Sequence, residues 1–123
     1  MMVVDSGTVR KDRRRAQRTP AVLAVALDTE GKQGRHGVTR DLSEKGLLVV
    51  TPSAFKRGDR VSVKVHAGGE DVNVSGQITR VDENPISSPE LWRWRVGIEL
   101  DSPLPSDFVE RGLRVSRRVK TYV

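Results

Sequence analysis

The 123-residue sequence contains no cysteine and only five aromatic residues. Without cysteine there is no disulfide, no thiolate metal site and no cysteine nucleophile. The longest strongly apolar run is Ala21 to Leu27, whereas a membrane-spanning helix needs about 20 residues. We therefore expect no membrane insertion, and the N-terminus has no pattern typical of a secretory signal. A cytoplasmic location is the simplest expectation.

Basic residues are abundant and unevenly distributed, within a formal net charge of +6. Residues 10–18 carry a net charge of +5 and residues 111–120 carry another +5, so the rest of the chain is mildly acidic. Basic segments attract nucleic acid, anionic lipid or a phosphate-containing ligand. A solvated surface without a specific partner is the alternative interpretation.

Short apolar segments with period-two alternation dominate the chain from residue 21 onward. Residues 61–65 alternate valine with polar residues, and residues 92–100 alternate in the same way from Trp92 and Trp94 to Leu100. This pattern is typical of half-buried strands. Turn signals separate about six such segments, and no long helical pattern lies between them. We predict a mainly β fold, a small barrel or sandwich, with Trp92 and Trp94 in its core.

The last segment has a different pattern. Phe108 and Val109 lie four or five residues before Leu113, a spacing that suits one face of a helix. Asp107 and the prolines before it favour a helix N-terminus here. We predict a short C-terminal helix over about residues 104–118.

Catalytic and metal-binding patterns are weak. His36 and His66 are the only histidines, and no further nitrogen or sulfur ligand stands at a metal-like spacing. The sequence has neither a phosphate-binding loop nor a dinucleotide fingerprint. We expect no catalytic residue, no metal and no cofactor, and an enzyme is the least favoured class.

An arginine-rich motif lies just before the first predicted strand. Residues 13–18 read Arg-Arg-Arg-Ala-Gln-Arg, so that Arg14 and Arg18 are four residues apart. A guanidinium donates two parallel hydrogen bonds to a phosphate or a guanine edge, and it stacks on bases. Alone, such a run is a weak indication of a binding site.

A second motif, Asp-Leu-Ser-Glu-Lys-Gly, occupies residues 41–46. The Asp41 carboxylate can accept hydrogen bonds from the paired N–H groups of a guanine edge. Ser43 can bond to a backbone, phosphate or base, and Gly46 permits a close backbone approach or a positive φ angle. Alone, this pattern is typical of a turn.

Together, the two motifs are much more specific. The order Arg-x-x-x-Arg, strand, Asp-x-Ser-x-x-Gly, apolar strand resembles the PilZ domain over roughly residues 10–115. The resemblance implies a six-stranded antiparallel β-barrel with a C-terminal helix, and binding of cyclic di-GMP, a bacterial second messenger. The expected organisation is a flexible leader (1–12), a PilZ-like domain (13–118, with the arginine segment 13–18, the barrel 20–101 and the helix) and a tail (119–123).

The resemblance also implies particular binding residues. In the family, the arginines clamp the phosphates and guanines of the ligand, and the second motif completes the site. The residues at the matching positions are Arg13, Arg14, Arg18, Asp41, Ser43 and Gly46. Arg40, next to Asp41, is our own addition, as a phosphate or stacking contact.

The expected function is that of a cyclic di-GMP receptor in which the ligand orders the arginine segment. The chain has no room for a separate output domain, so we expect an unidentified protein partner or a change between monomer and dimer. Motility, exopolysaccharide synthesis and biofilm control are the processes that the resemblance suggests. The alternatives are a PilZ-fold adaptor that acts without ligand and a basic barrel that binds nucleic acid, which the few aromatic residues disfavour.

Overall fold

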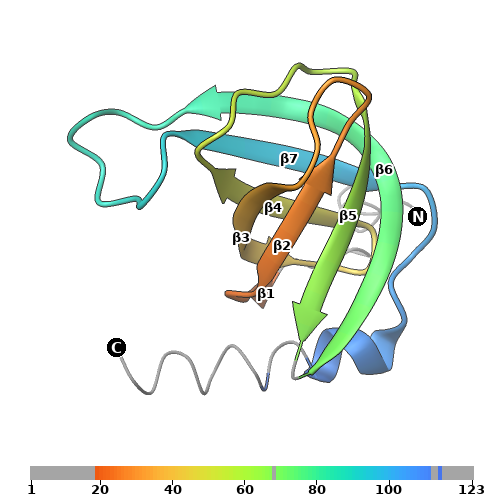
Figure 1. Cartoon of the computed structure of the whole chain (residues 1–123). Helices are drawn as coiled ribbons and strands as arrows, with labels where there is room; N and C mark the ends of the chain where they lie inside the picture. Colours follow the sequence, from red (N-terminus) through yellow and green to blue (C-terminus); the bar gives the residue numbers. More distant parts are fainter. Residues whose placement is uncertain (1–18, 68, 112–113, 115–123) are drawn as a thin grey trace, which may run out of the picture.

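The computed structural model describes residues 19–67, 69–111 and 114. Within them the chain forms seven strands and one helix (Figure 1). The strands are β1 (Thr19–Pro20), β2 (Ala24–Asp28), β3 (Arg35–Leu42), β4 (Gly46–Thr51), β5 (Arg60–Ala67), β6 (Glu70–Glu83) and β7 (Trp94–Leu100). The helix begins at residue 106 and is described as far as residue 111, and residue 114 is also helical.

Strands β2 to β7 close into a six-stranded antiparallel barrel. Around the barrel the order is β2, β3, β4, β7, β6, β5 and again β2, and all neighbouring strands are antiparallel. The short strand β1 pairs with the end of β3. Each barrel strand thus has a partner on both sides, which removes open sheet edges. The predicted barrel with a short helix is confirmed, and the sandwich alternative is wrong.

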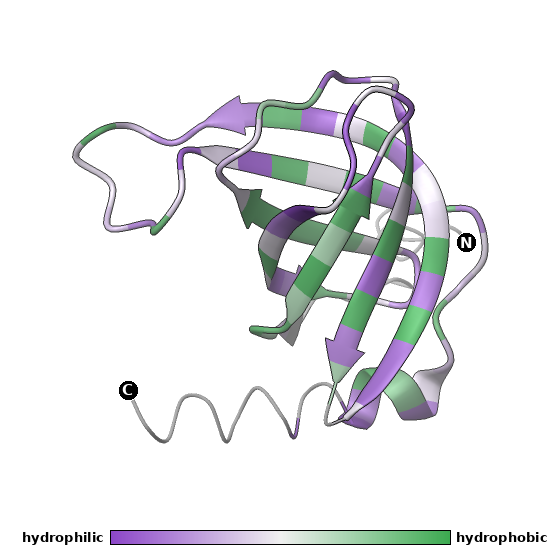
Figure 2. Ribbon diagram, viewed as in Figure 1, coloured by the Kyte–Doolittle hydropathy of each residue, from purple (hydrophilic) through white to green (hydrophobic). Residues whose placement is uncertain are grey.

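The interior is filled by alternate side chains of the strands. Along β5, Val61, Val63 and Val65 are buried, whereas Ser62 and Lys64 between them are exposed. Figure 2 shows this alternation as apolar and polar bands along the strands. Burial of one such apolar side chain stabilises a fold by about 1.5–3 kcal/mol.

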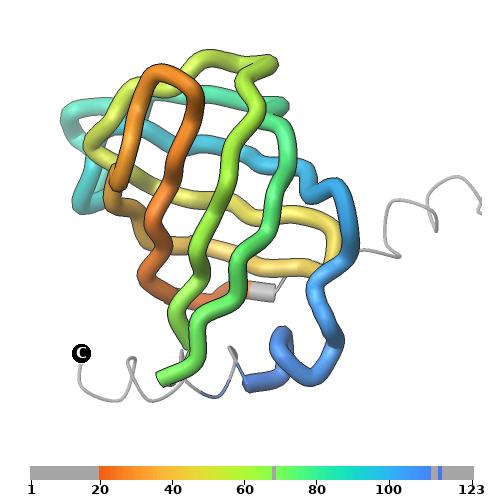
Figure 3. Tube along the Cα trace, turned by 45° about the vertical axis from the view of Figure 1, so that its right-hand side comes forward, coloured from red at the N-terminus to blue at the C-terminus, as the bar shows by residue number. Residues whose placement is uncertain are grey.

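The helix closes one end of the barrel (Figure 3). Its Phe108 is completely buried, and Leu104 just before the helix is 2% exposed, so both belong to the core. Arg111 holds the helix against the β5–β6 hairpin through Glu70 at 2.8 Å, and it also contacts Asp107 at 2.9 Å. Apolar burial and the Arg111–Glu70 pair together place the helix across the barrel end, whereas the Arg111–Asp107 pair lies within the helix.

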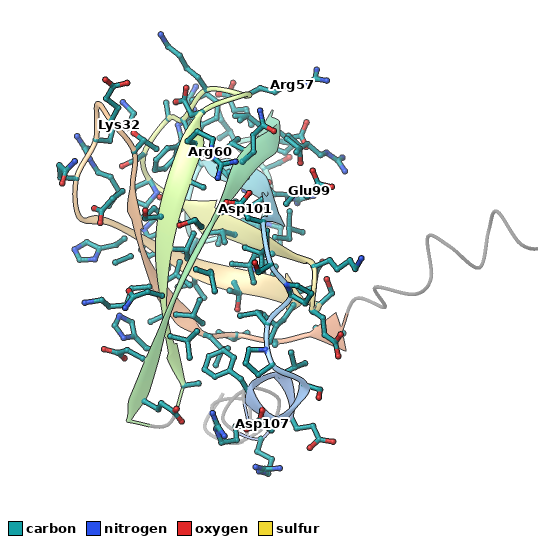
Figure 4. The ribbon with its side chains drawn as sticks, turned by 90° about the vertical axis from the view of Figure 1, so that its right-hand side faces the viewer. Lys32, Arg57, Arg60, Glu99, Asp101 and Asp107 are labelled. Atoms are coloured by element: carbon teal, nitrogen blue, oxygen red, sulfur yellow. The ribbon has the colours of Figure 1, made fainter. Side chains whose placement is uncertain are left out.

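The opposite end of the barrel carries a different set of charged residues. Figure 4 shows Arg60 and Asp101 facing each other near Lys32 and Arg57, far from Asp107 on the helix. The Arg60 guanidinium and the Asp101 carboxylate form an ion pair between β5 and the segment after β7. Both side chains are substantially exposed, so the pair contributes little to stability.

Gly76 interrupts the alternation of β6 for a steric reason. It pairs with Leu100 of β7, and a Cβ atom at this position would overlap the backbone carbonyl oxygen of Glu99. Only glycine therefore allows β6 and β7 to approach this closely.

The prediction that Trp92 and Trp94 enter the core is wrong. Strand β7 begins at Trp94, so Trp92 lies before it in the β6–β7 loop, and both side chains are only half-buried. The Trp94 ring lies at the surface beneath Arg93, whose guanidinium carbon is 5.8 Å from the ring centroid. A tryptophan ring with a cation over its face is stable where it is partly exposed to solvent. The alternation of apolar and polar residues alone therefore wrongly placed Trp94 in the core.

Candidate functional site

A β-bulge in β3 brings two polar residues together on the outer face of the barrel. Thr39 pairs with Val49 and Asp41 pairs with Leu48, so Arg40 is an extra residue with no partner of its own in the β3–β4 register. A bulge allows two consecutive side chains to share one face of a sheet. Arg40 and Asp41 are both half-buried there, one beside the other.

Strand β1 joins this same place. Thr19 pairs with Leu42, and Pro20 pairs with Asp41. The backbone N–H of Ala21 also donates to the carbonyl oxygen of Arg40 at 3.2 Å. The chain therefore enters the barrel directly beside Asp41, at the residue that follows the first sequence motif.

Thr39 fixes that entry from inside the barrel. Its hydroxyl is completely buried, donates to the carbonyl oxygen of Ala21 at 2.6 Å and accepts from the N–H of Leu23 at 2.8 Å. These two bonds hold residues 21–23 against β3. Both backbone groups would be left unsatisfied in the barrel wall if the hydroxyl were removed.

Thr39→Val keeps the shape of the side chain but leaves the Ala21 carbonyl and the Leu23 N–H without hydrogen-bond partners. We therefore expect it to lower the free energy of unfolding by about 1–3 kcal/mol. Urea unfolding followed by circular dichroism measures the change. Thr79→Val is the matched control. Thr79 is exposed, and its hydroxyl makes only a 3.4 Å hydrogen bond to the carbonyl oxygen of Gly97. Equal losses in the two variants would contradict this role.

Ser43 closes the turn between β3 and β4. Its hydroxyl accepts from the N–H groups of Lys45 at 3.2 Å and Gly46 at 3.0 Å, and it lies 3.3 Å from the carbonyl oxygen of Gly46. The residue is 3% exposed. In this structure the Ser43 hydroxyl therefore bonds to backbone, one of the three partners that the sequence left open.

Gly46 begins β4, where it is buried and pairs with Glu99 of β7. The positive φ angles of glycines in the described residues are at Gly34, Gly58 and Gly69. Gly46 is not among them, so the positive φ angle that the sequence left open is not adopted at this position.

The Arg40 side chain is held by the carboxylate of Glu90, which belongs to the β6–β7 loop and is far from Arg40 in the sequence. Its Nε lies 2.9 and 3.0 Å from the two carboxylate oxygens of Glu90, and its Nη2 lies 2.6 Å from Oε1. The side chains are 31% and 17% exposed, so the pair is partly desolvated. The hydrogen bonds from Arg40 lower the pKa of the Glu90 carboxyl below its ordinary value, and the charge of Arg95 adds to the effect.

The Arg40–Glu90 pair makes a contribution to the free energy of unfolding that depends on pH. A carboxyl whose pKa is lower in the folded state stabilises the fold above its unfolded pKa of about 4.3, and the contribution is lost as pH falls through the folded pKa. We expect wild type to lose more stability between about pH 5 and pH 3 than Glu90→Gln. Urea midpoints across this range measure the difference, and parallel curves would contradict it.

The structure thus gathers Arg40, Asp41, Ser43 and Gly46 in one bulged hairpin, with β1 beside it. The remaining predicted site residues, Arg13, Arg14 and Arg18, lie outside the described residues. Sequence analysis missed Glu90, because it lies 50 residues from Arg40 and no motif connects the two.

The described residues were compared with two further kinds of site, a metal centre and a membrane-spanning helix, and contain neither. No group of three or more histidine, aspartate or glutamate side chains is arranged to hold a metal ion. No helix there has the length and apolar character needed to cross a bilayer.

The family model of the PilZ domain matches residues 12–114. The chain belongs to the PilZ family. The match includes both motifs and every strand of the barrel. No curated protein matches the sequence at a significant level.

Solved PilZ domains have the same fold. The PilZ domain of Escherichia coli YcgR, solved with c-di-GMP, is 15% identical, with a TM-score of 0.68 over 89% of this chain and 96% of that one. The PilZ domain of CeSA from a cellulose-synthesizing bacterium is 19% identical, with a TM-score of 0.51 over 85% and 99%. Bacillus subtilis MotI/DgrA, an inhibitor of motility, is 19% identical, with a TM-score of 0.61; the match covers 89% of this chain but only 52% of that protein.

Proposed function

We propose that this protein is a cyclic di-GMP receptor that passes the signal to a partner protein when its arginine segment closes over the ligand. The proposed binding residues are Arg13, Arg14, Arg18, Arg40, Asp41, Ser43 and Gly46. Membership of the PilZ family and the ligand of the YcgR domain support this choice of ligand.

The register of β1 on β3 carries the proposal. Arg18 directly precedes Thr19, and Thr19 and Pro20 pair with Leu42 and Asp41. Thr19, the residue that follows the first motif, thus lies on the backbone beside the second motif.

The chemistry of this face suits the ligand. Cyclic di-GMP carries two phosphate charges, which arginine forks bind, and two guanines, which guanidinium planes stack on. The Asp41 carboxylate accepts from the adjacent N1–H and N2–H groups of guanine, a pair that adenine lacks. Ser43 and Gly46 would act through the backbone, by holding the tight turn that follows β3, the strand that carries Asp41.

Signalling would follow from ordering of the arginine segment. Part of the binding free energy would be used to fix residues 10–18 across the bulged hairpin. The ordered segment would present a new basic surface next to the barrel, and a partner protein that recognises it would bind only the liganded form. The named relatives include an inhibitor of motility and a domain of CeSA, so the partner would determine which process is controlled.

Equilibrium binding of fluorescently labelled cyclic di-GMP tests the receptor function. We expect saturable binding that unlabelled cyclic di-GMP reverses and cyclic di-AMP does not, because Asp41 selects the guanine edge. Absence of saturable binding by folded protein would overturn the proposal. The chain would then be a PilZ-fold adaptor that acts through protein contacts alone.

A further inference from the structure

The hydrogen bonds of Arg40 in this structure conflict with its proposed role as a ligand contact. The Nε and Nη2 donors form one of the two forked edges of the guanidinium, and both bond to the carboxylate of Glu90. A phosphate or a guanine edge is bound through the same two-pronged arrangement. Arg40 therefore cannot present this edge to the ligand while it holds Glu90, and the Glu90 carboxylate also offsets its positive charge.

A second arginine lies close enough to act on the same carboxylate. Arg95 of β7 pairs with Val50, which in turn pairs with Val38 of β3, so it lies on the barrel wall that carries Arg40. Its charge contributes to the lowered pKa of Glu90. Among the described residues, the Nε of Arg95 is a buried donor without a hydrogen-bond acceptor. Glu90 thus has a second cationic neighbour, one of whose N–H donors has no acceptor.

We propose that Glu90 lowers the affinity of the protein for its ligand by competing for Arg40. Glu90 holds Arg40 until a ligand phosphate displaces it, and the displaced carboxylate then pairs with Arg95. This inference rests on the proposed function. The exchange conserves the number of ion pairs, because Arg40 gains the phosphate as Glu90 gains Arg95. Without Arg95, displacement would leave a carboxylate that is only 17% exposed without a cation, which is costly.

The exchange also involves the β6–β7 loop, because Glu90 belongs to it. The loop has its own internal bonds, from Asn84 N–H to the carbonyl oxygen of Arg93 at 2.7 Å and from Asn84 Nδ2 to that of Trp92 at 2.9 Å. Movement of Glu90 from Arg40 to Arg95 would change the surroundings of Trp92 in the same loop. Tryptophan fluorescence in a Trp94→Phe background would report this movement.

The main test is titration of cyclic di-GMP into wild type and Glu90→Gln. The amide keeps the size of the side chain and removes its charge, so we expect roughly tenfold tighter binding. Damage to the loop would weaken binding, so an increase in affinity separates competition from a merely structural role. Weaker or unchanged binding by Glu90→Gln would overturn the proposal.

Glu83→Gln is the matched control. Glu83 is also a glutamate paired with an arginine, Arg93, at the edge of the same loop, and its side chain is 47% exposed. The Glu83→Gln substitution removes the same charge without releasing Arg40, so we expect the affinity for cyclic di-GMP to change less than twofold. Equal tightening in both variants would indicate a general electrostatic effect and would overturn the proposal.

A double-mutant cycle assigns the effect to the three side chains. Glu90→Gln should no longer tighten binding when Arg40 is replaced by Gln. Arg95→Gln should weaken binding several-fold in wild type and have no effect in the Glu90→Gln background. If the three changes are simply additive, the exchange does not occur.

The outcomes separate this inference from the proposed function. Tighter binding by Glu90→Gln than by a wild type that itself binds saturably supports both. Normal binding by wild type with no gain in Glu90→Gln overturns the exchange alone. Absence of binding by both proteins overturns the receptor function, and the exchange with it.

Discussion

Replacement of Arg14 by alanine should reduce affinity for cyclic di-GMP at least 100-fold. Arg14 is the first arginine of the Arg-x-x-x-Arg motif, and in the proposed complex its guanidinium forms two parallel bonds to the ligand. Removing one side of a desolvated, charged hydrogen-bonded pair typically costs about 2–5 kcal/mol, or more. Isothermal titration calorimetry of wild type and Arg14→Ala measures this loss and gives the stoichiometry.

Arg15→Ala provides the control for net charge. Arg15 lies in the same segment and carries the same charge, but it is not a motif position. We expect a change of no more than about threefold, since a charge that makes no specific contact with the ligand contributes little. If Arg15→Ala reduced the affinity as much as Arg14→Ala, a diffuse basic segment would be attracting the ligand, and the specific clamp would be wrong.

Phe108→Ala should have the largest effect on stability. Phe108 is completely buried and is the main side chain by which the helix closes the barrel. Truncation of a buried phenylalanine typically costs about 3–5 kcal/mol, a large part of the 5–15 kcal/mol that stabilises an ordinary domain. We expect the Tm in thermal unfolding to fall by roughly 10 °C or more.

Ile86→Ala is the contrasting variant. Ile86 is a large apolar residue of the β6–β7 loop that is fully exposed. Its truncation should change stability by less than about 0.5 kcal/mol. A small effect of Phe108→Ala, comparable to that of Ile86→Ala, would mean that the helix is not an integral part of the core.

Period-two patterns were sufficient to predict a mainly β fold, a barrel or a sandwich, and the resemblance to the PilZ domain favoured the barrel. Val61, Val63 and Val65 alternate with polar residues in the sequence and are buried in the structure. A closed antiparallel sheet with one solvent-exposed face requires alternation of apolar and polar residues in its strands. The pattern was misleading only at the start of β7, where the alternation continues into a loop and Trp92 lies outside the strand.

The arrangement of the candidate site depends on features that a sequence pattern does not carry. The bulge at Arg40 places two consecutive residues on one face, and strict alternation would have separated Arg40 from Asp41. The Glu90 contact joins residues 50 positions apart. Ser43 is a case of a different kind, because its hydroxyl could serve a turn or a ligand equally well, and only the fold shows that it holds the turn.

The distance between the two motifs, with and without ligand, tests the central claim most directly. Because the chain has no cysteine, spin labels can be attached at Gln17→Cys and Glu44→Cys alone, and Ser62→Cys with Glu44→Cys gives a control pair within the barrel. Saturating cyclic di-GMP should shorten and narrow the distance distribution of the first pair and leave the control unchanged. An unaltered distribution for the first pair, at a ligand concentration that saturates binding, would contradict closure of the arginine segment over the site.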